Sequence, residues 1–307
     1  MFHRITGKGE SYFIPPMAVS CRNFSLLMER MAKSWEIISM EKAAEKLESG
    51  RCKGRAAAIT FDDGYRDNFE TAMNLLKPKG IPATFFIPVS QIDRGEPYWW
   101  DYLHSVIQKN QTAFLKWINK SKFGSIAAHI GPENRKMPVD RMAVRYLNTL
   151  ENTFRTDFLK ALQTEFGPYE GERLLMNWEE IRHLHKCGFS VGSHTLSHIP
   201  LTDLHPDDAK REIAESGKIL SRRIGAPIKG FSYPRGAWNM ELANMAKQAG
   251  YEYAVTTVFG SNKSGCDRFA LSRRSISDYP DVRSFFAVPM YLLEMTGRLD
   301  RFIAKRR

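Results

Sequence analysis

Short apolar runs alternate with helix-like stretches along most of the chain, and this alternation limits the possible folds more than any other feature. Runs with the length of buried strands span residues 56–61, 83–87, 189–192, 230–233 and 251–257. The stretches between them carry apolar residues at helical spacing, with capping signals such as Ser39, Asn177 and Gly250 at their ends. Strands joined by helices predict an α/β fold with a parallel sheet, whose chemistry gathers at the carboxyl ends of the strands.

The alternation lapses between about residues 94 and 176, in a longer, mostly helical stretch that is rich in lysine and arginine. Both flanks belong to one alternating series, so we interpret this stretch as an insertion in a single domain that spans residues 1–307. The C-terminal segment, about residues 283–307, is apolar and then basic. It is typical of a closing helix with a solvated basic end, and peripheral association with an anionic membrane surface is the alternative.

The composition excludes several classes of protein. Hydrophobic residues make up 43% of the chain and charged residues 26%, which is typical of globular proteins and argues against disorder, collagen or a coiled coil. No run reaches the roughly 20 apolar residues of a spanning helix, and the first residues have no apolar signal core. We therefore expect a cytoplasmic protein, with the inner face of the membrane as an alternative site.

The charge balance bears on the partners of the protein. A net charge of +11 predicts attraction to anionic partners, such as a phosphate-linked or lipid-linked saccharide. Zinc-finger spacings and RNA-binding aromatic motifs are absent from the sequence, so we expect no specific nucleic-acid partner. The sequence leaves the oligomeric state open.

Candidate metal ligands follow two of the predicted strands. His194 and His198 lie four residues apart after one strand, and Asp62 and Asp63 follow another. Two imidazoles and one carboxylate match the three protein ligands of a catalytic zinc site, which leaves a position for water. The neighbouring carboxylate could then act as the base. Each motif alone is weak, because histidines at this spacing are common and Asp-Asp-Gly is usually an ordinary turn. Together they predict one divalent ion, with zinc favoured over cobalt, nickel or manganese.

Three segments resemble motifs of the polysaccharide deacetylases, carbohydrate esterase family four. They are Thr60–Gly64, Ser193–His198 and Phe231–Gly236, within a resemblance that spans about residues 1–90 and 177–277. The resemblance implies a distorted (β/α)7 barrel and metal-dependent removal of acetyl from N-acetylated sugars. By motif position it implies that Asp62 is the catalytic base and that Asp63, His194 and His198 bind the metal.

The third and the late motif depart from the family pattern. Ser232 stands where the family commonly has arginine, so the arginine that orients the base is predicted to be missing. Arg235 follows the proline where tyrosine is common, and its backbone N–H is predicted to bind the oxyanion. The late Leu-x-His motif, which supplies the general acid in many members, reads Leu271–Arg273, and arginine cannot donate a proton at neutral pH.

A replacement acid is predicted at the start of the chain. The segment Met1–Ile5 is similar to the Tyr-His-x-Val/Ile segment of a subgroup that includes the poly-N-acetylglucosamine deacetylases. In that subgroup the acid histidine comes from the first strand, which implies that His3 is the general acid here. The alternative is that so early a residue is simply frayed.

Tyr233, Arg235 and Trp238 are predicted to contact the substrate, because they lie in or just after the third motif. The flat face of an aromatic side chain such as Trp238 suits a sugar ring, although aromatic residues more often pack in cores. The sequence thus predicts a metal-dependent hydrolase that removes acetyl from an N-acetylated sugar in a polysaccharide, oligosaccharide or glycan precursor. The alternatives are hydrolysis of an O-acetyl group or another amide at the same site, and a non-catalytic glycan-binding domain.

Overall fold

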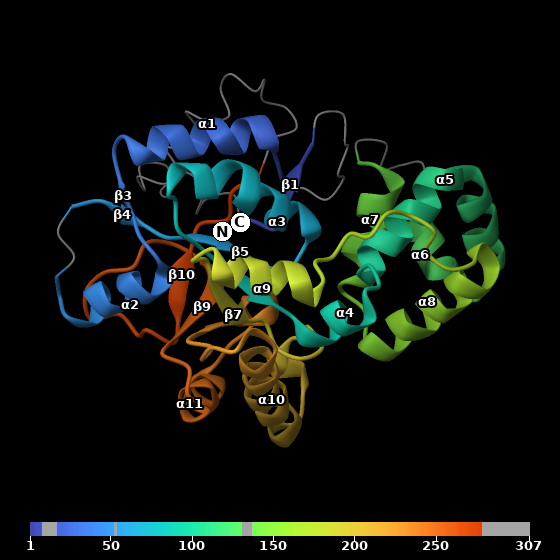
Figure 1. Cartoon of the computed structure of the whole chain (residues 1–307). Coiled ribbons are helices and arrows are strands. Elements are labelled where there is room, and N and C mark those ends of the chain that lie inside the picture. Colours follow the sequence, from blue (N-terminus) through green and yellow to red (C-terminus); the bar gives the residue numbers. More distant parts are fainter. Residues whose placement is uncertain (8–16, 52–53, 131–136, 278–307) are drawn as a thin grey trace. The chain divides into compact units, whose positions relative to one another are not determined.

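The computed structural model describes residues 1–7, 17–51, 54–130 and 137–277. The chain divides into two compact units (Figure 1). Unit 1 combines Met1–Gly95 with Leu174–Arg307, and unit 2 is Glu96–Arg173. The predicted basic segment at about 283–307 lies outside the described residues.

A parallel sheet forms the centre of unit 1. Its six strands follow the order β10-β9-β8-β7-β6-β5, and every neighbouring pair is parallel. The strands are β5 (Ile59–Phe61), β6 (Ala83–Ile87), β7 (Ser190–Ser193), β8 (Gly230–Ser232), β9 (Tyr253–Phe259) and β10 (Leu271–Arg273). Two shorter parallel pairs accompany them: β1 (Arg4–Thr6) with β2 (Ala18–Ser20), and β3 (Glu36–Ile37) with β4 (Ala56–Ala57).

The first two residues connect the two edges of this sheet. At one edge, the backbone N–H of Phe2 donates to Thr60 and its carbonyl accepts from Asp62, at 2.9 and 3.0 Å. At the other edge, the nitrogen of Met1 donates to the carbonyl of Arg274 and its own carbonyl accepts from Ile276, at 2.9 and 3.2 Å. The sheet is therefore curved into a distorted (β/α) barrel, which confirms the predicted fold class.

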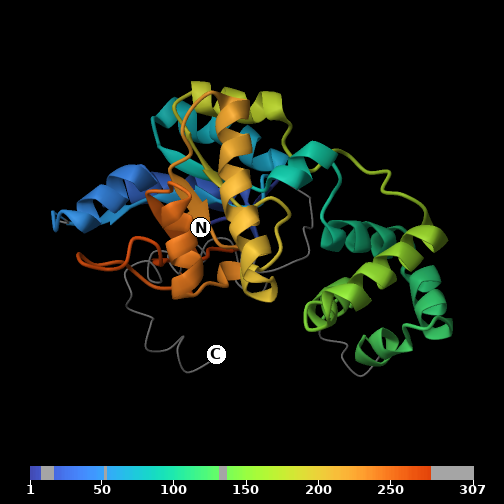
Figure 2. The same cartoon turned by 90° about the horizontal axis from the view of Figure 1, so that it is seen from below.

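Helices follow the strands of unit 1, as the alternation predicts. They are α1 (Cys21–Ala32), α2 (Met40–Glu48), α3 (Arg66–Thr71), α4 (Val89–Arg94), α9 (Trp178–Lys186), α10 (Pro206–Ile224) and α11 (Met240–Gln248). Ser39 caps α2, and Asn177 opens α9 with a reciprocal capping box through Glu180. Helix α10 packs against α11 and β7, and Figure 2 shows α10 along its length.

Strands β5 and β6, next to the site, are buried on both faces, as in a parallel sheet that is covered on both sides. All residues of β5 and β6 are buried. The rings of Phe61 and Phe85 stack with centroids 4.8 Å apart, and Phe2 packs against Phe61 at 5.6 Å. Each such side chain contributes about 1.5–3 kcal/mol when it is removed from water. This packing fixes the start of the loop after β5.

Unit 2 is helical throughout its described elements. It contains α5 (Trp99–Lys120), α6 (Gly124–His129), α7 (Val139–Leu147) and α8 (Asn152–Phe166). Its core is aromatic, with Trp117 in contact with Phe114, Phe123 and Phe158. None of the described helices of either unit combines the length and the apolar character that crossing a bilayer requires.

Candidate metal centre and active site

Most of the predicted site residues come from three loops at the carboxyl ends of parallel strands. Asp62 and Asp63 follow β5, the two histidines follow β7, and Arg235 follows β8. Within the described part of the chain, four residues other than glycine have positive φ: Asp63, Thr195, His198 and Arg235, at 71°, 68°, 59° and 56°. All four belong to these loops. Such conformations cost about 1–3 kcal/mol each and cluster at functional sites, so the loops are held in shapes that packing alone does not favour.

Asp63, His194 and His198 converge on one point. The Nε2 atoms of His194 and His198 lie 3.4 and 3.1 Å from Oδ1 of Asp63, and one ligand atom from each residue lies within 4.8 Å of the others. Nδ1 of His194 lies 2.7 Å from the carbonyl oxygen of Ser232, which directs Nε2 of the same ring toward Asp63. Two imidazole nitrogens and a carboxylate oxygen in this arrangement fit a zinc-type divalent ion.

The electrostatics of these three residues follow from their mutual contacts. Burial alone would raise the pKa of Asp63, but hydrogen bonds with both histidines hold it well below its usual value. Burial opposes protonation of both imidazoles. For His194 the contacts with Asp63 and Asp62 outweigh it and raise the pKa, whereas for His198 burial prevails and lowers the pKa. The carboxylate is therefore ionised and ready to bind a cation.

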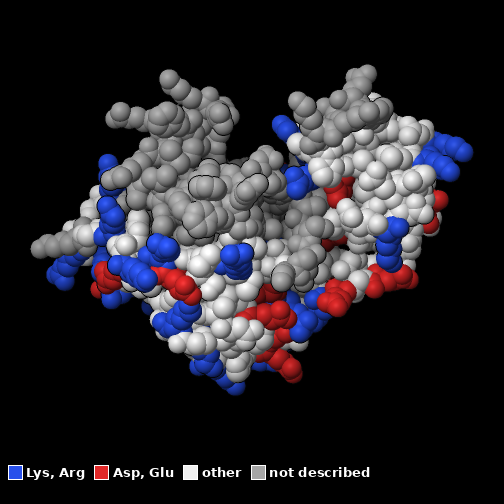
Figure 3. All heavy atoms as spheres, turned by 90° about the horizontal axis from the view of Figure 1, so that it is seen from above, with Lys and Arg blue, Asp and Glu red and all other residues white. Residues whose placement is uncertain are grey.

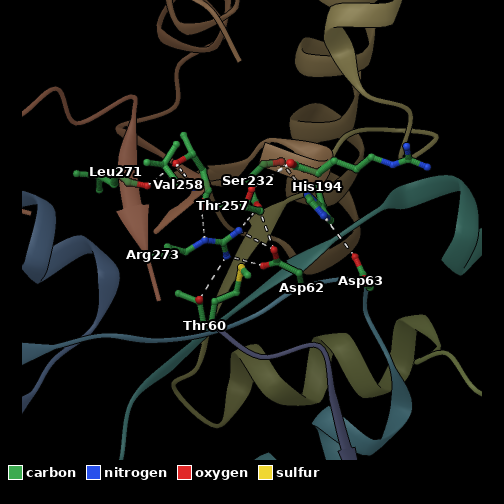
Figure 4. Close-up of polar contacts among 12 residues, drawn as sticks. Thr60, Asp62, Asp63, His194, Ser232, Thr257, Val258, Leu271 and Arg273 are labelled. Carbon is green, nitrogen blue, oxygen red and sulfur yellow. Dashed lines mark hydrogen bonds and ion pairs between the residues drawn. The ribbon is translucent and has the colours of Figure 1, made fainter. Parts of the chain in front are cut away.

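The neighbouring carboxylate, Asp62, is held by Arg273 (Figure 4). Nη1 of Arg273 donates to Oδ1 at 2.8 Å and Nη2 donates to Oδ2 at 2.7 Å, so the two groups form a buried bidentate pair. Burial by itself would raise the pKa of Asp62, but the guanidinium beside it lowers the pKa below its usual value. Asp62 is thus ionised at neutral pH and able to accept a proton.

This pair corrects one sequence-based interpretation. The arginine predicted to be missing is present, but it comes from β10 instead of from the position of Ser232. The hydroxyl of Ser232 occupies the same neighbourhood, because its Oγ lies 3.1 Å from Nη2 of Arg273 and 3.3 Å from Oδ2 of Asp62. A small side chain at position 232 leaves room for the guanidinium of Arg273, which comes from β10, two strands away in the same sheet.

His3 lies beside this group because Phe2 is bonded to the chain on both sides of Phe61. The burial of His3 lowers its pKa, while the charges of Asp63 and Asp62 act in the opposite direction. These interactions place the imidazole in the electrostatic neighbourhood of both carboxylates. The segment that carries it is tied to the sheet and is not frayed.

The predicted substrate contacts in and after the third motif differ in their exposure to solvent. Tyr233 is fully buried, its hydroxyl donates to the carbonyl of Phe269 at 3.0 Å, and burial raises its pKa. It belongs to the core, where a saccharide cannot reach its hydroxyl, which corrects its assignment as a substrate contact. Arg235 is exposed and in a left-handed conformation, and Trp238 is half-buried. Both remain predicted substrate contacts.

The sequence reading missed two residues that shape the site, and both carried a detectable signal. Arg273 stands two positions after the buried Leu271, so the two share one face of β10 and the arginine points inward. Glu212 stands three residues after Ala209 and one before Ile213, within the buried stripe of α10. A charged residue in an apolar stripe indicates a buried polar partner.

Comparisons with known proteins identify the family of this chain. The family model for polysaccharide deacetylase matches residues 49–254. The chain belongs to the polysaccharide deacetylase family. This confirms the resemblance, and the members of the family are hydrolases. A segment of 119 residues is 29% identical to YxkH of Bacillus subtilis, a curated relative named among polysaccharide deacetylases; it covers 39% of this chain and 43% of YxkH.

Solved structures share the fold of this chain. The Streptococcus pyogenes deacetylase PplD superposes with a TM-score of 0.62 at 16% identity, with 96% of each chain covered. IcaB from Ammonifex degensii gives a TM-score of 0.58 at 16% identity and covers 96% of each chain. The de-N-acetylase from Aggregatibacter actinomycetemcomitans gives 0.56 at 17% identity, covering 94% of this chain and 97% of the other.

The charged residues are mixed on the face drawn in Figure 3. Lysine and arginine side chains occur there beside aspartate and glutamate side chains over the described residues. The net charge of +11 is therefore not matched by one uniformly basic surface on the described part of this face.

Proposed function

We propose that this deacetylase removes the acetyl group from an N-acetylated saccharide in a metal-dependent hydrolysis. The observation that supports it most is the convergence of Asp63, His194 and His198 on one point, beside an Asp62 carboxylate fixed by Arg273. Metal-assisted hydrolysis requires a set of metal ligands, here two imidazoles and a carboxylate, and a base beside them.

Asp63, His194 and His198 would hold one divalent ion, with zinc favoured and cobalt, nickel or manganese as alternatives. When bound there, such an ion polarises the acetyl carbonyl and lowers the pKa of its water ligand toward about 7. The donor atoms support this assignment because they lie within 4.8 Å of one another, with Asp63 and His194 buried and His198 partly buried, and because the Ser232 carbonyl fixes the orientation of His194.

Four residues of the chain supply the remaining functional groups. Asp62 accepts a proton from the attacking water, and Arg273 keeps both of its carboxylate oxygens in place. The backbone N–H of Arg235 donates to the oxygen of the acetyl group as negative charge develops on it. His3 donates a proton to the departing amine, so that acetate and a free amino sugar are released.

The finer identity of the substrate is part of the same proposal. We place the reaction on a nucleotide-linked or lipid-diphosphate-linked saccharide, met in the cytoplasm or at the inner face of the membrane, with peripheral membrane association. The net charge of +11 supports an anionic substrate. A comparison of acetate release from UDP-N-acetylglucosamine and from neutral N-acetylglucosamine oligomers, at low and high salt, tests this choice. A preference for the neutral oligomers at both salt concentrations would contradict it.

Replacement of Asp62 by asparagine tests the proposed reaction. Asp62→Asn removes the base but none of the three predicted ligands, so acetate release should fall by about 10²–10⁴-fold while zinc remains bound. Acetate is measured enzymatically, and bound zinc is measured by elemental analysis of the purified protein. Asp207→Asn, at an exposed position of α10, is the control. Full activity of the Asp62→Asn protein would refute the assignment of the base.

A further inference from the structure

Glu212 of α10 forms hydrogen bonds with the loop that carries both histidines. Oε2 of Glu212 accepts hydrogen bonds from the backbone N–H groups of Leu196 and Ser197, at 2.8 and 2.9 Å. Oε1 accepts a third from the hydroxyl of Ser197 at 2.6 Å. Both carboxylate oxygens are therefore used, and all three bonds go to the residues between His194 and His198.

The position of these bonds matters because the loop is not a shape that the chain adopts on its own. Thr195 and His198, on either side of the bonded amides, have positive φ values of 68° and 59°. Such residues keep these conformations only where the surroundings determine them. Within the loop, the backbone N–H of His198 donates to Oγ1 of Thr195 at 3.0 Å. The contacts of Glu212 add an anchor from outside the loop.

The same helix also holds the end of strand β7. The hydroxyl of Ser193 donates to Oγ of Ser216 at 2.7 Å and accepts from the backbone N–H of Thr195 at 3.3 Å. Ser216 stands one helical turn after Glu212, on the same face of α10. One helix thus anchors the chain on both sides of His194, and the three bonds of Glu212 lie between the two histidines.

We propose that Glu212 is a positioning residue that sets the metal affinity of the Asp63, His194 and His198 site, which rests on the proposed function. Its carboxylate fixes the backbone between the two imidazoles, so both Nε2 atoms reach Oδ1 of Asp63 from the required directions. Partners outside the ligand set typically change metal affinity by about 10–100-fold when they are lost.

Zinc binding to the metal-free full-length chain tests this proposal. Zinc is titrated against a chromophoric chelator, with wild type, Glu212→Ala, Glu212→Gln and the control Glu215→Ala. Glu215 is on the same helix, but its described ion pair joins only the exposed Lys218. We expect Glu212→Ala to bind zinc about 10–100-fold more weakly. Glu212→Gln should stay within about threefold of wild type, since an amide oxygen can accept both backbone bonds and its NH₂ can donate to Ser197. Glu215→Ala should match wild type.

Cobalt supplies a second readout that a general loss of stability does not produce. The visible absorption of bound Co²⁺ depends on its ligand geometry, so Glu212→Ala at saturating cobalt should give a spectrum different from that of wild type. Unchanged zinc affinity and an unchanged cobalt spectrum in Glu212→Ala would overturn the proposal. A loss in Glu212→Gln as large as in Glu212→Ala would overturn it too, because charge instead of geometry would then set the affinity.

Two further outcomes separate this proposal from the proposed function. If wild type binds neither zinc nor cobalt, the metal centre itself is wrong and the proposed function fails. If Glu212→Ala does not fold, Glu212→Asp replaces it, since aspartate keeps the charge but is one methylene too short to reach the same amides. Weaker zinc binding by a folded Glu212→Asp protein supports the proposal, and wild-type affinity overturns it.

Discussion

Arg273 contacts both oxygens of Asp62 with its two terminal nitrogens, at 2.8 and 2.7 Å, and both side chains are buried. The guanidinium is itself fixed, because its Nε donates to the carbonyl of Thr256 at 2.8 Å and its Nη1 lies 3.3 Å from Oγ1 of Thr60. The Asp62 carboxylate is therefore connected through one arginine to strands β9 and β5. Asp62 can turn only if this arrangement breaks.

Replacement of Arg273 by lysine should reduce kcat about 100-fold with little change in KM, because a small misplacement of a catalytic group has an effect of this size. Lysine keeps the positive charge, but a single ammonium cannot contact both carboxylate oxygens in the same plane. Steady-state acetate release gives both constants. Arg273→Ala should lower kcat further and should also destabilise the fold. It leaves the buried Asp62 without its partner, which costs about 3–5 kcal/mol of folding free energy.

Added guanidinium ion distinguishes positioning from stability. In a folded Arg273→Ala protein, guanidinium in the vacated space should restore part of kcat at concentrations that do not lower the melting temperature. Methylammonium, which lacks the planar pair of donors, is the control. Equal rescue by both ions, or a lysine variant with the kcat of wild type, would show that the bidentate contact has no role in the reaction.

The replacement of His3 by glutamine should affect amide and ester substrates differently. An amine leaves only when it is protonated, whereas an activated phenol leaves as an anion, so only the amide needs a general acid. We expect a loss of about 10²–10⁴-fold in acetate release from the N-acetyl substrate. Hydrolysis of p-nitrophenyl acetate, followed by absorbance, should stay near the wild-type rate. Parallel losses on both substrates would mean that His3 supports the site without donating a proton.

The order of the barrel elements could be predicted from the sequence because local signals specified them. The predicted strand 83–87 and the cap of α2 at Ser39 match the structure, since apolar runs and capping residues act within a few positions. The segment after Asp63 shows the limit of such signals. No capping signal in the sequence marks how this helix begins and ends: it begins at Arg66 and continues into a π-helical turn over Ala72–Leu76.

The partners inside the site were harder to predict, because they join distant parts of the chain. The pair of Asp62 and Arg273 spans 211 positions, and no local pattern states which carboxylate a buried arginine meets. Tyr233 is buried by packing against Phe231 and bonded through its hydroxyl to the carbonyl of Phe269, and neither contact could be deduced from its place in a motif. Motif position indicated which three residues lie together, Asp63, His194 and His198, whereas the supporting contacts required the assembled barrel.

The glycine after Arg235 should not tolerate a side chain. Gly236 has φ of 69°, and a Cβ atom there would lie 2.1 Å from Oγ1 and 2.4 Å from the backbone nitrogen of Thr257. Gly250 has φ of 93° but no atom near the corresponding position, so it is a matched control for the backbone conformation alone. Thermal unfolding should show a loss of about 1 kcal/mol for Gly250→Ala and a larger one for Gly236→Ala. Equal losses would mean that the approach of Thr257 adds nothing.

The pair of Asp140 and His104 should make the stability of unit 2 depend on pH. Oδ2 of Asp140 lies 2.9 Å from Nδ1 of His104 and 3.0 Å from Nε2 of Gln108, and Oδ1 accepts from the backbone N–H of Arg141. Burial would raise the pKa of Asp140, but these contacts lower it below its usual value. A lowered pKa in the folded state adds stability above the unfolded value, about 3.9, which is lost as the pH falls through the folded value.

Asp140→Asn should therefore lower the melting temperature of the full chain at pH 7 and have a smaller effect near pH 3. At pH 7 the ionised carboxylate joins α5 to the start of α7, and an amide replaces two charge-assisted bonds with weaker ones. At pH 3, below the unfolded pKa, part of that advantage is already lost in wild type. Asp157→Asn, an exposed substitution in α8, corrects for the change in net charge. A difference between Asp140→Asn and wild type that is constant from pH 3 to pH 7 would contradict the expected contribution of the ionised group.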